Sequence, residues 1–438
     1  MNLQKVNAGV SLKKNIKIGF YFDNKNNSNI DFRKVAQGNP GVGGSEYSVV
    51  LISYLLSVRD NKINVCLFCT SEGVFPEKID ICVIEDLKSC IYKADFEGYD
   101  YLVVDSKKVN PSLLNTIRCK NVKLLLWANN FISKHELDDY AKIDSVYKIV
   151  NVGREQFELW VDHPIFDKSC YIYNTMPFPK DKDTLKPSSM RQPIVVYIGS
   201  LVKSKGFGAL AKAWPKVLND VPEAQLYVIG SGKLYDKNAI LGKYSIADEN
   251  FENEFMPYLL DSKGQILPSV HFLGVLGQEK YNILTKAKVG VPNPIGQTET
   301  FGYSAIEMQY MGCSITTMKC PGFLDTTIQN GSNILYANVK RLHKCIVKIL
   351  KSNENVDVTK TRSCIENQFG INVVVEQWEL LLTTDYVPNR ISYKNLFYRL
   401  KWMKIINYRL CKLFRIRPFV SFEYLHEYID KINSYVNR

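Results

Sequence analysis

Short apolar runs rich in β-branched residues alternate with helix-length amphipathic segments along most of this chain. The runs that predict strands are IKIGFYF, INVCLFC, DYLVVD, VKLLLWA and YKIVNV in the first half, and PIVVYIG, AQLYVIG, VHFLG, KVGVP and SITTM in the second. This alternation is typical of parallel sheets covered by helices on both faces. Between the halves, residues 177–193 are rich in Pro, Lys and Ser, which indicates a linker. The sequence therefore predicts an α/β protein with two doubly wound domains.

A length of 438 residues fits two such domains and a tail. We expect a first domain over residues 1–185, a second over residues 186–380 and a tail over residues 381–438. Open α/β sheets bind ligands at the carboxyl ends of their strands. Two facing domains would therefore hold a ligand in the cleft between them.

Hydropathy and cysteine usage indicate a cytoplasmic protein. No stretch approaches the ~18 consecutive apolar residues of a membrane-spanning helix, and the N-terminus lacks the apolar core of a signal peptide. The 11 cysteines are odd in number and follow no disulfide framework. Cys66 and Cys69 form a CxxC inside a predicted strand, which favours a buried structural role over redox or zinc chemistry.

The basic excess is concentrated near the C-terminus. Lys and Arg outnumber Asp and Glu by 12 in the whole chain. Residues 388–438 hold 11 basic and 3 acidic side chains, a net charge of +8, so the first 387 residues carry only +4. A nearly neutral body argues against a nucleic-acid groove running through the fold.

The most specific motif is PNPIGQTETFGYSAIEMQYMG, residues 292–312. It follows a predicted strand and leads into a predicted helix. Backbone amides at a helix N-terminus can hold a phosphate, and those of Thr300, Phe301 and Gly302 are the candidates. Because glycine has no Cβ, Gly302 would also let a ligand approach closely.

Two carboxylates bracket the same turn. Glu299 precedes it and Glu307 lies on the predicted helix. A carboxylate accepts hydrogen bonds from two hydroxyls, as a sugar or a ribose would offer. An alternative is that Ser304 and Glu307 form a capping box, in which Glu307 only stabilises the start of the helix.

These residues together resemble the retaining family-4 glycosyltransferases, which have the GT-B fold of two facing Rossmann-like domains. The matching residues are Pro292, Glu299, Phe301, Gly302, Ala305, Glu307 and Gly312. The resemblance implies that Glu299 contacts the hydroxyls of the transferred sugar and that Glu307 holds the ribose of the nucleotide. It also implies that the amides at 300–302 face the diphosphate, in a nucleotide-sugar domain that follows an N-terminal acceptor domain.

Residues 197–214, YIGSLVKSKGFGALAKAW, resemble the GRLxxxKG segment of that family, where Arg and Lys neutralise the leaving diphosphate. Lys205 matches the Lys and joins Glu299 as a catalytic candidate. Ser200 stands at the Arg position on the donor side, and this departure removes a bidentate phosphate contact. The alternative interpretation of Lys205 is a surface turn before a helix.

Residues 38–47, GNPGVGGSEY, are not a dinucleotide fingerprint, because Glu46 occupies the place of its third glycine. They resemble the GG loop of the family, whose backbone approaches the diphosphate and the acceptor. Gly43 and Gly44 are therefore donor-binding candidates, with exposed amides that could form a small anion nest. A plain flexible turn is the alternative.

Weaker matches extend the resemblance over roughly residues 16–380. Asn129 and Asn130 follow a predicted strand near the position of an acceptor-side His in the family, so we assign them a polar contact with the acceptor. Asn174 matches an Asn in the segment before the interdomain linker.

From Arg390 to Arg417 the chain has nine basic side chains and no acidic one. On a helical projection one stripe is apolar and consists of Leu396, Leu400, Met403, Ile406, Leu410 and Phe414, with Trp402 on its flank. The opposite side carries Lys394, Lys401, Lys404, Lys412 and Arg415. Such a helix suits an anionic membrane surface. The alternative is that the apolar stripe packs against the N-terminal domain and leaves the charges in solvent.

The resemblance predicts a retaining transferase that moves a hexose from a nucleotide-diphosphate sugar to a saccharide acceptor. With the tail, it predicts a lipid-linked acceptor, bacterial cell-surface polysaccharide synthesis and a peripheral position on the inner face of the plasma membrane. No metal cofactor and no nucleic-acid partner are expected. The alternatives are a GT-B sugar-nucleotide epimerase or hydrolase, and a catalytically silent GT-B partner protein that Ser200 would favour.

Overall fold

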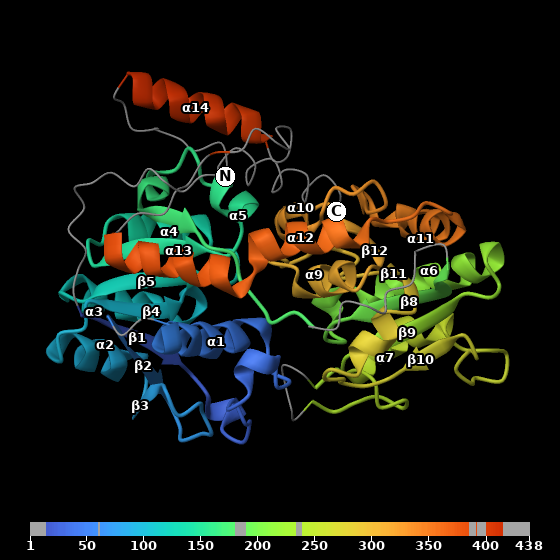
Figure 1. Cartoon of the computed structure of the whole chain (residues 1–438), viewed down its shortest axis with the longest axis horizontal. Helices are drawn as coiled ribbons and strands as arrows, with labels where there is room; N and C mark the ends of the chain where they lie inside the picture. Colours follow the sequence, from blue (N-terminus) through green and yellow to red (C-terminus); the bar gives the residue numbers. More distant parts are fainter. Residues whose placement is uncertain are drawn as a thin grey trace. The chain divides into compact units, whose positions relative to one another are not determined.

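The computed structural model describes residues 15–59, 62–179, 190–233, 239–384, 391 and 400–414 (Figure 1). The chain divides into two compact units, each discontinuous in sequence. Unit 1 comprises Met1–Arg33, Val49–Asn174 and Asn372–Arg438, and unit 2 comprises Lys34–Ser48 and Thr175–Ile371. Each unit is built on one parallel sheet with helices, so the predicted α/β class is confirmed. Within the predicted linker, residues 180–189 lie outside the described residues.

The sheet of unit 1 has the strand order β3-β2-β1-β4-β5-β6-β7 in the described residues. Its strands are β1 (Ile16–Phe22), β2 (Ile63–Cys69), β3 (Asp80–Val83), β4 (Tyr101–Asp105), β5 (Lys123–Ala128), β6 (Val146–Asn151) and β7 (Ser169–Tyr171). Central strands are buried on both faces, which is why they appear in the sequence as near-continuous apolar runs. The chain order reverses between β1 and β4, so that loops from both strands meet at one edge of the sheet.

Some helices of unit 1 begin at side chains that satisfy free backbone amides. Its helices are α1 (Gly44–Arg59), α2 (Leu87–Phe96), α3 (Leu114–Arg118), α4 (Lys134–Ala141), α5 (Arg154–Glu158), α13 (Ile371–Thr384) and α14 (Lys401–Leu413). Asp86 caps α2 by accepting a hydrogen bond from the amide of Ser89. Trp378 of α13 is fully buried, and its ring lies 5.0 Å from that of Trp127 on β5. Segment 372–384 is therefore part of the core of unit 1.

The sheet of unit 2 has the order β10-β9-β8-β11-β12-β13 in the described residues. Its strands are β8 (Gln192–Ile198), β9 (Gln225–Ile229), β10 (Val270–Phe272), β11 (Ala287–Gly290), β12 (Ser314–Met318) and β13 (Ile334–Tyr336). Its helices are α6 (Phe207–Asp220), α7 (Glu249–Phe255), α8 (Lys280–Leu284), α9 (Tyr303–Tyr310), α10 (Pro321–Thr326), α11 (Leu342–Lys351) and α12 (Val358–Phe369). The core includes Trp214 of α6, Val195 of β8 and Ile346 of α11, all fully buried. This packing positions the loop that joins β8 to α6.

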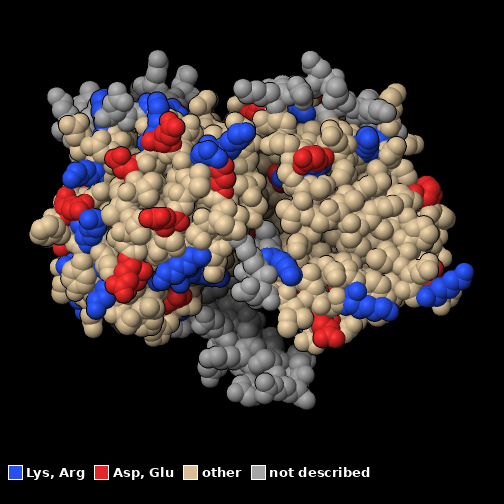
Figure 2. Space-filling view, turned by 90° about the horizontal axis from the view of Figure 1, so that it is seen from below, with Lys and Arg blue, Asp and Glu red and all other residues tan. Residues whose placement is uncertain are grey.

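The structure also bears on the predictions made from the cysteines, the hydropathy and the charge. Cys66 and Cys69 lie in β2, which confirms that the CxxC is in a buried strand, and burial raises the pKa of their thiols to about 11 and about 12. All 11 cysteines fall within the described residues and are free thiols. In the described part of the chain, no helix is both long and apolar enough to cross a membrane. On the face drawn in Figure 2, basic and acidic side chains are interspersed, in keeping with a nearly neutral body.

Candidate active site

Two loops of unit 2 that carry the sequence motifs follow neighbouring strands. β8 is followed by residues 199–206, and β11 is followed by residues 291–302. Because β8 and β11 pair in parallel, their carboxyl ends lie at the same edge of the sheet. The two motifs are therefore brought together although about 90 residues separate them in sequence.

Lys205 and Glu299 form an ion pair at this edge. The Lys205 Nζ lies 3.1 Å from Oε2 of Glu299, and the side chains are 22% and 13% exposed. The Asn293 side-chain amide donates to the same Oε2 at 2.9 Å. Asn293 was not predicted from sequence, although its position shortly after a strand, between two prolines, could have suggested a constrained polar residue. Both charges remain accessible, so a ligand can reach them.

Two glycines hold the backbone around this pair. Gly206 has φ +72°, and a Cβ there would lie 2.8 Å from the side chain of Ile295. A Cβ on Gly322 would lie 2.8 Å from the carbonyl oxygen of Glu299, which accepts a hydrogen bond from the Gly322 amide at 3.2 Å. Close backbone approach on both sides thus determines where Lys205 and Glu299 can place their side chains.

Helix α9 begins directly after Thr300, Phe301 and Gly302, as predicted. Gly302 is its N-cap residue, and no side chain caps the helix. The predicted alternative of a capping box between Ser304 and Glu307 is therefore wrong. A Cβ on Gly302 would lie 2.6 Å from the ring of Phe323, so packing alone already requires a glycine there.

The carboxylate of Glu307 instead binds the first two residues of α8. Its Oε1 contacts the Lys280 ammonium and accepts a hydrogen bond from the Tyr281 hydroxyl at 3.2 Å. The Glu307 and Lys280 side chains are 8% and 17% exposed. Sequence reasoning missed Lys280 and Tyr281, because they lie on a different element and no spacing relates them to Glu307. Glu299 and Glu307 therefore each pair with a lysine, Lys205 and Lys280 respectively.

The GG loop, residues 38–47, groups with unit 2 and contacts the start of α9. The Ser48 hydroxyl lies 2.6 Å from that of Tyr303. A Cβ on Gly44 would lie 3.2 Å from the Tyr303 ring, so the loop passes close to this side chain. The side-chain oxygen of Asn39 accepts hydrogen bonds from the backbone amides of Gly41 and Val42. Any nest of amides for an anion is thus left to Gly43 and Gly44.

Ser200, at the position of the family Arg, is turned into the fold. Its side chain is buried, and its hydroxyl donates to the carbonyl of Ser231 at 3.3 Å. The adjacent backbone is equally crowded, since Gly230 has φ +145° and a Cβ there would lie 1.9 Å from the carbonyl oxygen of Gly199. A long cationic side chain at position 200 would have to leave this buried position to reach a ligand.

On unit 1, the acceptor-side candidates Asn129 and Asn130 lie at the carboxyl end of β5, beside the end of β4. The Asn129 amide donates to Oδ2 of Asp105 at 3.3 Å and accepts from the Asn174 amide at 3.4 Å. Burial raises the pKa of the Asp105 carboxyl, although hydrogen bonds from Lys107 and Asn129 oppose the shift. The Asn130 carbonyl accepts from a Gln156 side chain at 3.0 Å. Asn129 and Asn174 thus belong to one polar chain that ends on Asp105, a residue not singled out from sequence.

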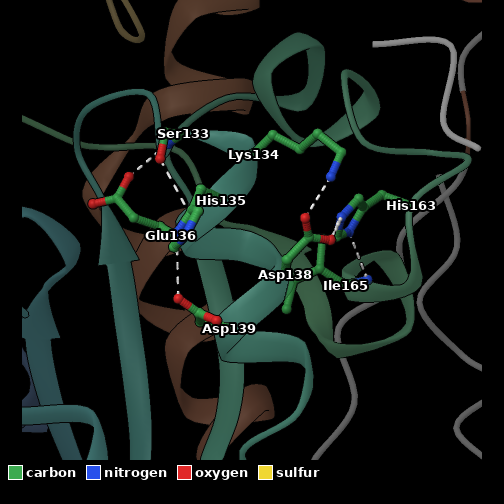
Figure 3. Close-up of polar contacts among 8 residues, drawn as sticks. All are labelled: Ser133, Lys134, His135, Glu136, Asp138, Asp139, His163 and Ile165. Atoms are coloured by element: carbon green, nitrogen blue, oxygen red, sulfur yellow. Dashed lines mark hydrogen bonds and ion pairs between the residues drawn. The ribbon is translucent and has the colours of Figure 1, made fainter. Parts of the chain in front are cut away.

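A second polar cluster of unit 1 surrounds the start of α4 (Figure 3). Asp138 binds the Lys134 ammonium and lies 3.0 Å from Nε2 of His163, whose Nδ1 accepts from the amide of Ile165 at 3.1 Å. Because Nδ1 is an acceptor, the imidazole is neutral with its proton on Nε2. Burial lowers the pKa of His163, against the attraction of Asp138. This cluster satisfies buried polar groups and supports the fold.

Comparison with known proteins is consistent with this geometry. HepE of Anabaena, solved with UDP and glucose, superposes with a TM-score of 0.58 at 13% identity, over 83% of this chain and 98% of that chain. Sucrose-phosphate synthase of Thermosynechococcus elongatus gives a TM-score of 0.59 at 14% identity, over 84% and 98% of the two chains. The lipopolysaccharide outer core galactosyltransferase WaaB gives 0.53 at 13% identity, over 83% and 98%. The two sheets are therefore the Rossmann-like halves of a GT-B fold.

Sequence comparison indicates which class of enzyme this chain resembles. Residues 192–352 match the model of the family glycosyl transferases group 1. An uncharacterized glycosyltransferase of Haemophilus influenzae is 23% identical over 273 residues, which span 60% of this chain and 70% of the relative. These matches support a glycosyltransferase, and the matched segment contains both lysine–glutamate pairs.

Proposed function

We propose that this chain is a retaining glycosyltransferase of the family-4 type, which transfers a hexose from a nucleotide-diphosphate sugar to a saccharide acceptor. The observation that carries the proposal is the Lys205–Glu299 pair. Two motifs expected to bind the donor meet there at 3.1 Å, at the edge of a parallel sheet where ligands bind.

In this proposal the donor rearranges the pair. The hydroxyls of the sugar donate to Glu299, while the Lys205 ammonium turns to the diphosphate. The N-terminus of α9, at residues 300–302, adds a positive dipole end. Glu307, held by Lys280 and Tyr281, accepts from the ribose hydroxyls. HepE was solved with UDP and glucose, so uridine diphosphate sugars are the first donors to test.

The chemistry assigned to the chain is electrostatic. The acceptor hydroxyl attacks the sugar from the face that the diphosphate leaves, and the leaving phosphate takes the hydroxyl proton. The protein holds the reactants in place and stabilises the charge that develops on the diphosphate. Lys205 and the start of α9 supply positive charge without a metal ion. Among the described residues, no group of three His, Cys, Asp or Glu side chains is arranged as metal ligands.

For the acceptor we propose a lipid-linked saccharide used in cell-surface polysaccharide synthesis. Asn129 and Asn130 would contact it, with Asn129 oriented by Asp105. The fold shared with WaaB, named as a lipopolysaccharide outer core galactosyltransferase, is in keeping with this assignment. The enzyme would work in the cytoplasm, peripherally attached to the inner face of the plasma membrane through residues 390–417.

A screen of nucleotide-diphosphate sugars, scored by nucleotide release with and without saccharide acceptors, tests the proposal. We expect release with at least one donor, stimulated by an acceptor, and a product in which the anomeric configuration of the donor is kept. Equal release without any acceptor would identify a hydrolase. An absence of both release and nucleotide-diphosphate binding would identify a silent partner protein.

A further inference from the structure

Helix α14, red in Figure 1, docks on unit 1 through Lys401 and Lys404. The Lys401 ammonium binds two carboxylates of the α5 segment, lying 3.2 Å from Oε1 of Glu155 and in direct contact with Oε2 of Glu158. The three side chains are 4%, 1% and 1% exposed. Removing one partner of a buried ion pair leaves an uncompensated charge, which is strongly destabilising. The inward direction of Lys401 is therefore determined by the two glutamates.

Further contacts hold the same face of α14 inward. Lys404 Nζ donates to the carbonyl of Leu159 at 2.7 Å, the Asn407 amide donates to Oδ2 of Asp162 at 3.1 Å, and the Tyr408 ring packs edge-on against Phe166 at 5.4 Å. These contacts recur at intervals of three or four residues, which is one face of a helix. Rotating α14 about its axis would break all of them and would bring apolar side chains against three carboxylates.

The outward face of α14 is apolar. Its exposed side chains are Trp402 (40%), Ile406 (48%), Leu410 (49%), Leu413 (74%) and Phe414 (64%). They fall within one arc of the helix, and Arg409 and Lys412 are exposed beside it. The alternative that the apolar stripe packs against the N-terminal domain is wrong for residues 400–414, because Lys401 and Lys404 face unit 1 instead. Leu396 of the predicted stripe, and Lys394 and Arg415 of the predicted basic side, lie outside the described residues.

We propose that this outward face, which we call the α14 apolar face (Trp402, Ile406, Leu410, Leu413 and Phe414), inserts into the surface of an anionic lipid bilayer. The inference rests on the peripheral position proposed above and identifies the surface that makes the contact. Lys401 and Lys404 do not reach the lipid, since both are buried. Insertion of apolar side chains therefore provides most of the binding, and the exposed cations Arg409 and Lys412 add a preference for anionic headgroups.

The size of the face favours a bilayer over a protein partner. A 13-residue helix is about 20 Å long and about 10 Å wide, so its outline covers roughly 200 Å². A stable protein interface buries about 800 Å² on each partner. A bilayer needs no matching surface, and the exposed cations Arg409 and Lys412 complement its anionic lipids. Trp402 at the rim is a residue type enriched at membrane interfaces.

Vesicle flotation of the full chain tests the proposal, with vesicles of phosphatidylcholine alone and mixed with phosphatidylglycerol. Each apolar side chain withdrawn from the bilayer should lower partitioning on the order of tenfold. We therefore expect Ile406→Asp/Leu410→Asp to lower binding to both vesicles about a hundredfold. The matched control, Val83→Asp/Phe96→Asp, changes two exposed apolar residues elsewhere on unit 1 and should stay within about twofold. Lys412→Gln should weaken binding to the anionic vesicles only, about fivefold.

Tryptophan fluorescence gives a second readout, which does not depend on the aspartate variants. Trp127, Trp214 and Trp378 are fully buried and Trp160 is half-buried, so lipids brominated on their acyl chains should quench mainly Trp402. The quenching should disappear in Trp402→Phe.

Binding by Ile406→Asp/Leu410→Asp at the wild-type level, or quenching that survives in Trp402→Phe, would overturn the inference. A wild-type chain that dimerises in solution and becomes monomeric in the double variant would assign the face to a second copy instead. The proposed function is tested separately, because nucleotide release with a water-soluble acceptor needs no vesicles. A wild-type chain that releases nucleotide but does not bind vesicles contradicts only the α14 inference. A wild-type chain that binds vesicles but releases no nucleotide contradicts only the proposed function.

Discussion

The ammonium group of Lys205 lies 3.1 Å from a carboxylate oxygen of Glu299, although 94 residues separate them in sequence. Neither charge is deeply buried, and the amide of Asn293 fixes the same carboxylate oxygen. Because Glu299 neutralises Lys205, the pair binds an anion weakly unless another group hydrogen-bonds to the carboxylate at the same time. A sugar diphosphate carries both groups, hydroxyls for Glu299 and phosphates for Lys205. The pair therefore suits a ligand that brings both at once.

Lys205→Ala should lower kcat by two to three orders of magnitude, because an electrostatic contact to a developing charge is worth about 3–4 kcal/mol. Lys203→Ala is the matched control, since Lys203 lies two residues away, is exposed and pairs with Glu254. We expect the control to keep nearly full activity. Initial rates of nucleotide release measure both variants, and equal rates for the two would contradict the assignment.

Glu307→Gln and Lys280→Met should raise KM for the donor by roughly tenfold to a hundredfold, because a hydrogen bond to a charged group contributes about 1.5–3 kcal/mol. The kcat should change little, since Glu307 would bind the ribose rather than the reacting centre and Lys280 orients Glu307. Lys286→Met is the control, because Lys286 lies just after α8 and is exposed. Steady-state kinetics with varied donor separates the two constants; a pure loss of kcat would place Glu307 at the chemistry instead.

Gly230→Ala should destabilise unit 2 by more than about 3 kcal/mol, because a Cβ would overlap the carbonyl oxygen of Gly199 at 1.9 Å. Gly264→Ala is the comparison, as Gly264 also has positive φ (+74°) but has open space around its Cβ position. That variant should lose only about 1 kcal/mol from backbone strain. Urea unfolding reports both losses, and similar values would show that strain rather than crowding determines the effect.

The buried His163 should make the protein less stable in mild acid. Burial lowers its pKa below the ordinary 6.5, so the folded state keeps it neutral while the unfolded state takes up a proton. Its contribution to the free energy of unfolding is complete above about pH 6.5 and is lost as the pH falls towards the lower folded pKa. Protonation would also remove the Nδ1 acceptor of the Ile165 amide.

Urea unfolding from about pH 8 to about pH 5 measures this effect. In His163→Asn the side-chain oxygen can still accept from the Ile165 amide, and the loss of stability in acid should be smaller than in wild type. The carboxylates elsewhere titrate in both proteins and cancel in the comparison. Identical pH profiles would mean that His163 is not the titrating group.

Much of the fold follows from local pattern. All ten strands predicted from apolar runs are present, and the helix predicted after Gly44 corresponds to α1. The strands that sequence reasoning missed are β3, β7 and β13, which have only three or four residues each. Each lies at or next to a sheet edge, where a short strand buries too little to leave an apolar run in the sequence.

The sequence by itself determined the α/β alternation and the motifs that contain Lys205, Glu299 and Glu307, because periodicity and turn residues act over a few neighbouring positions. Only the tertiary structure decided that Glu307 binds Lys280 rather than capping its own helix. It also decided that α14 turns Lys401 and Lys404 inward, since the buried glutamates of α5 that pair with Lys401 lie more than 240 residues earlier in the chain. An amphipathic pattern specifies two faces of a helix, but the charges of its neighbours decide which face is covered.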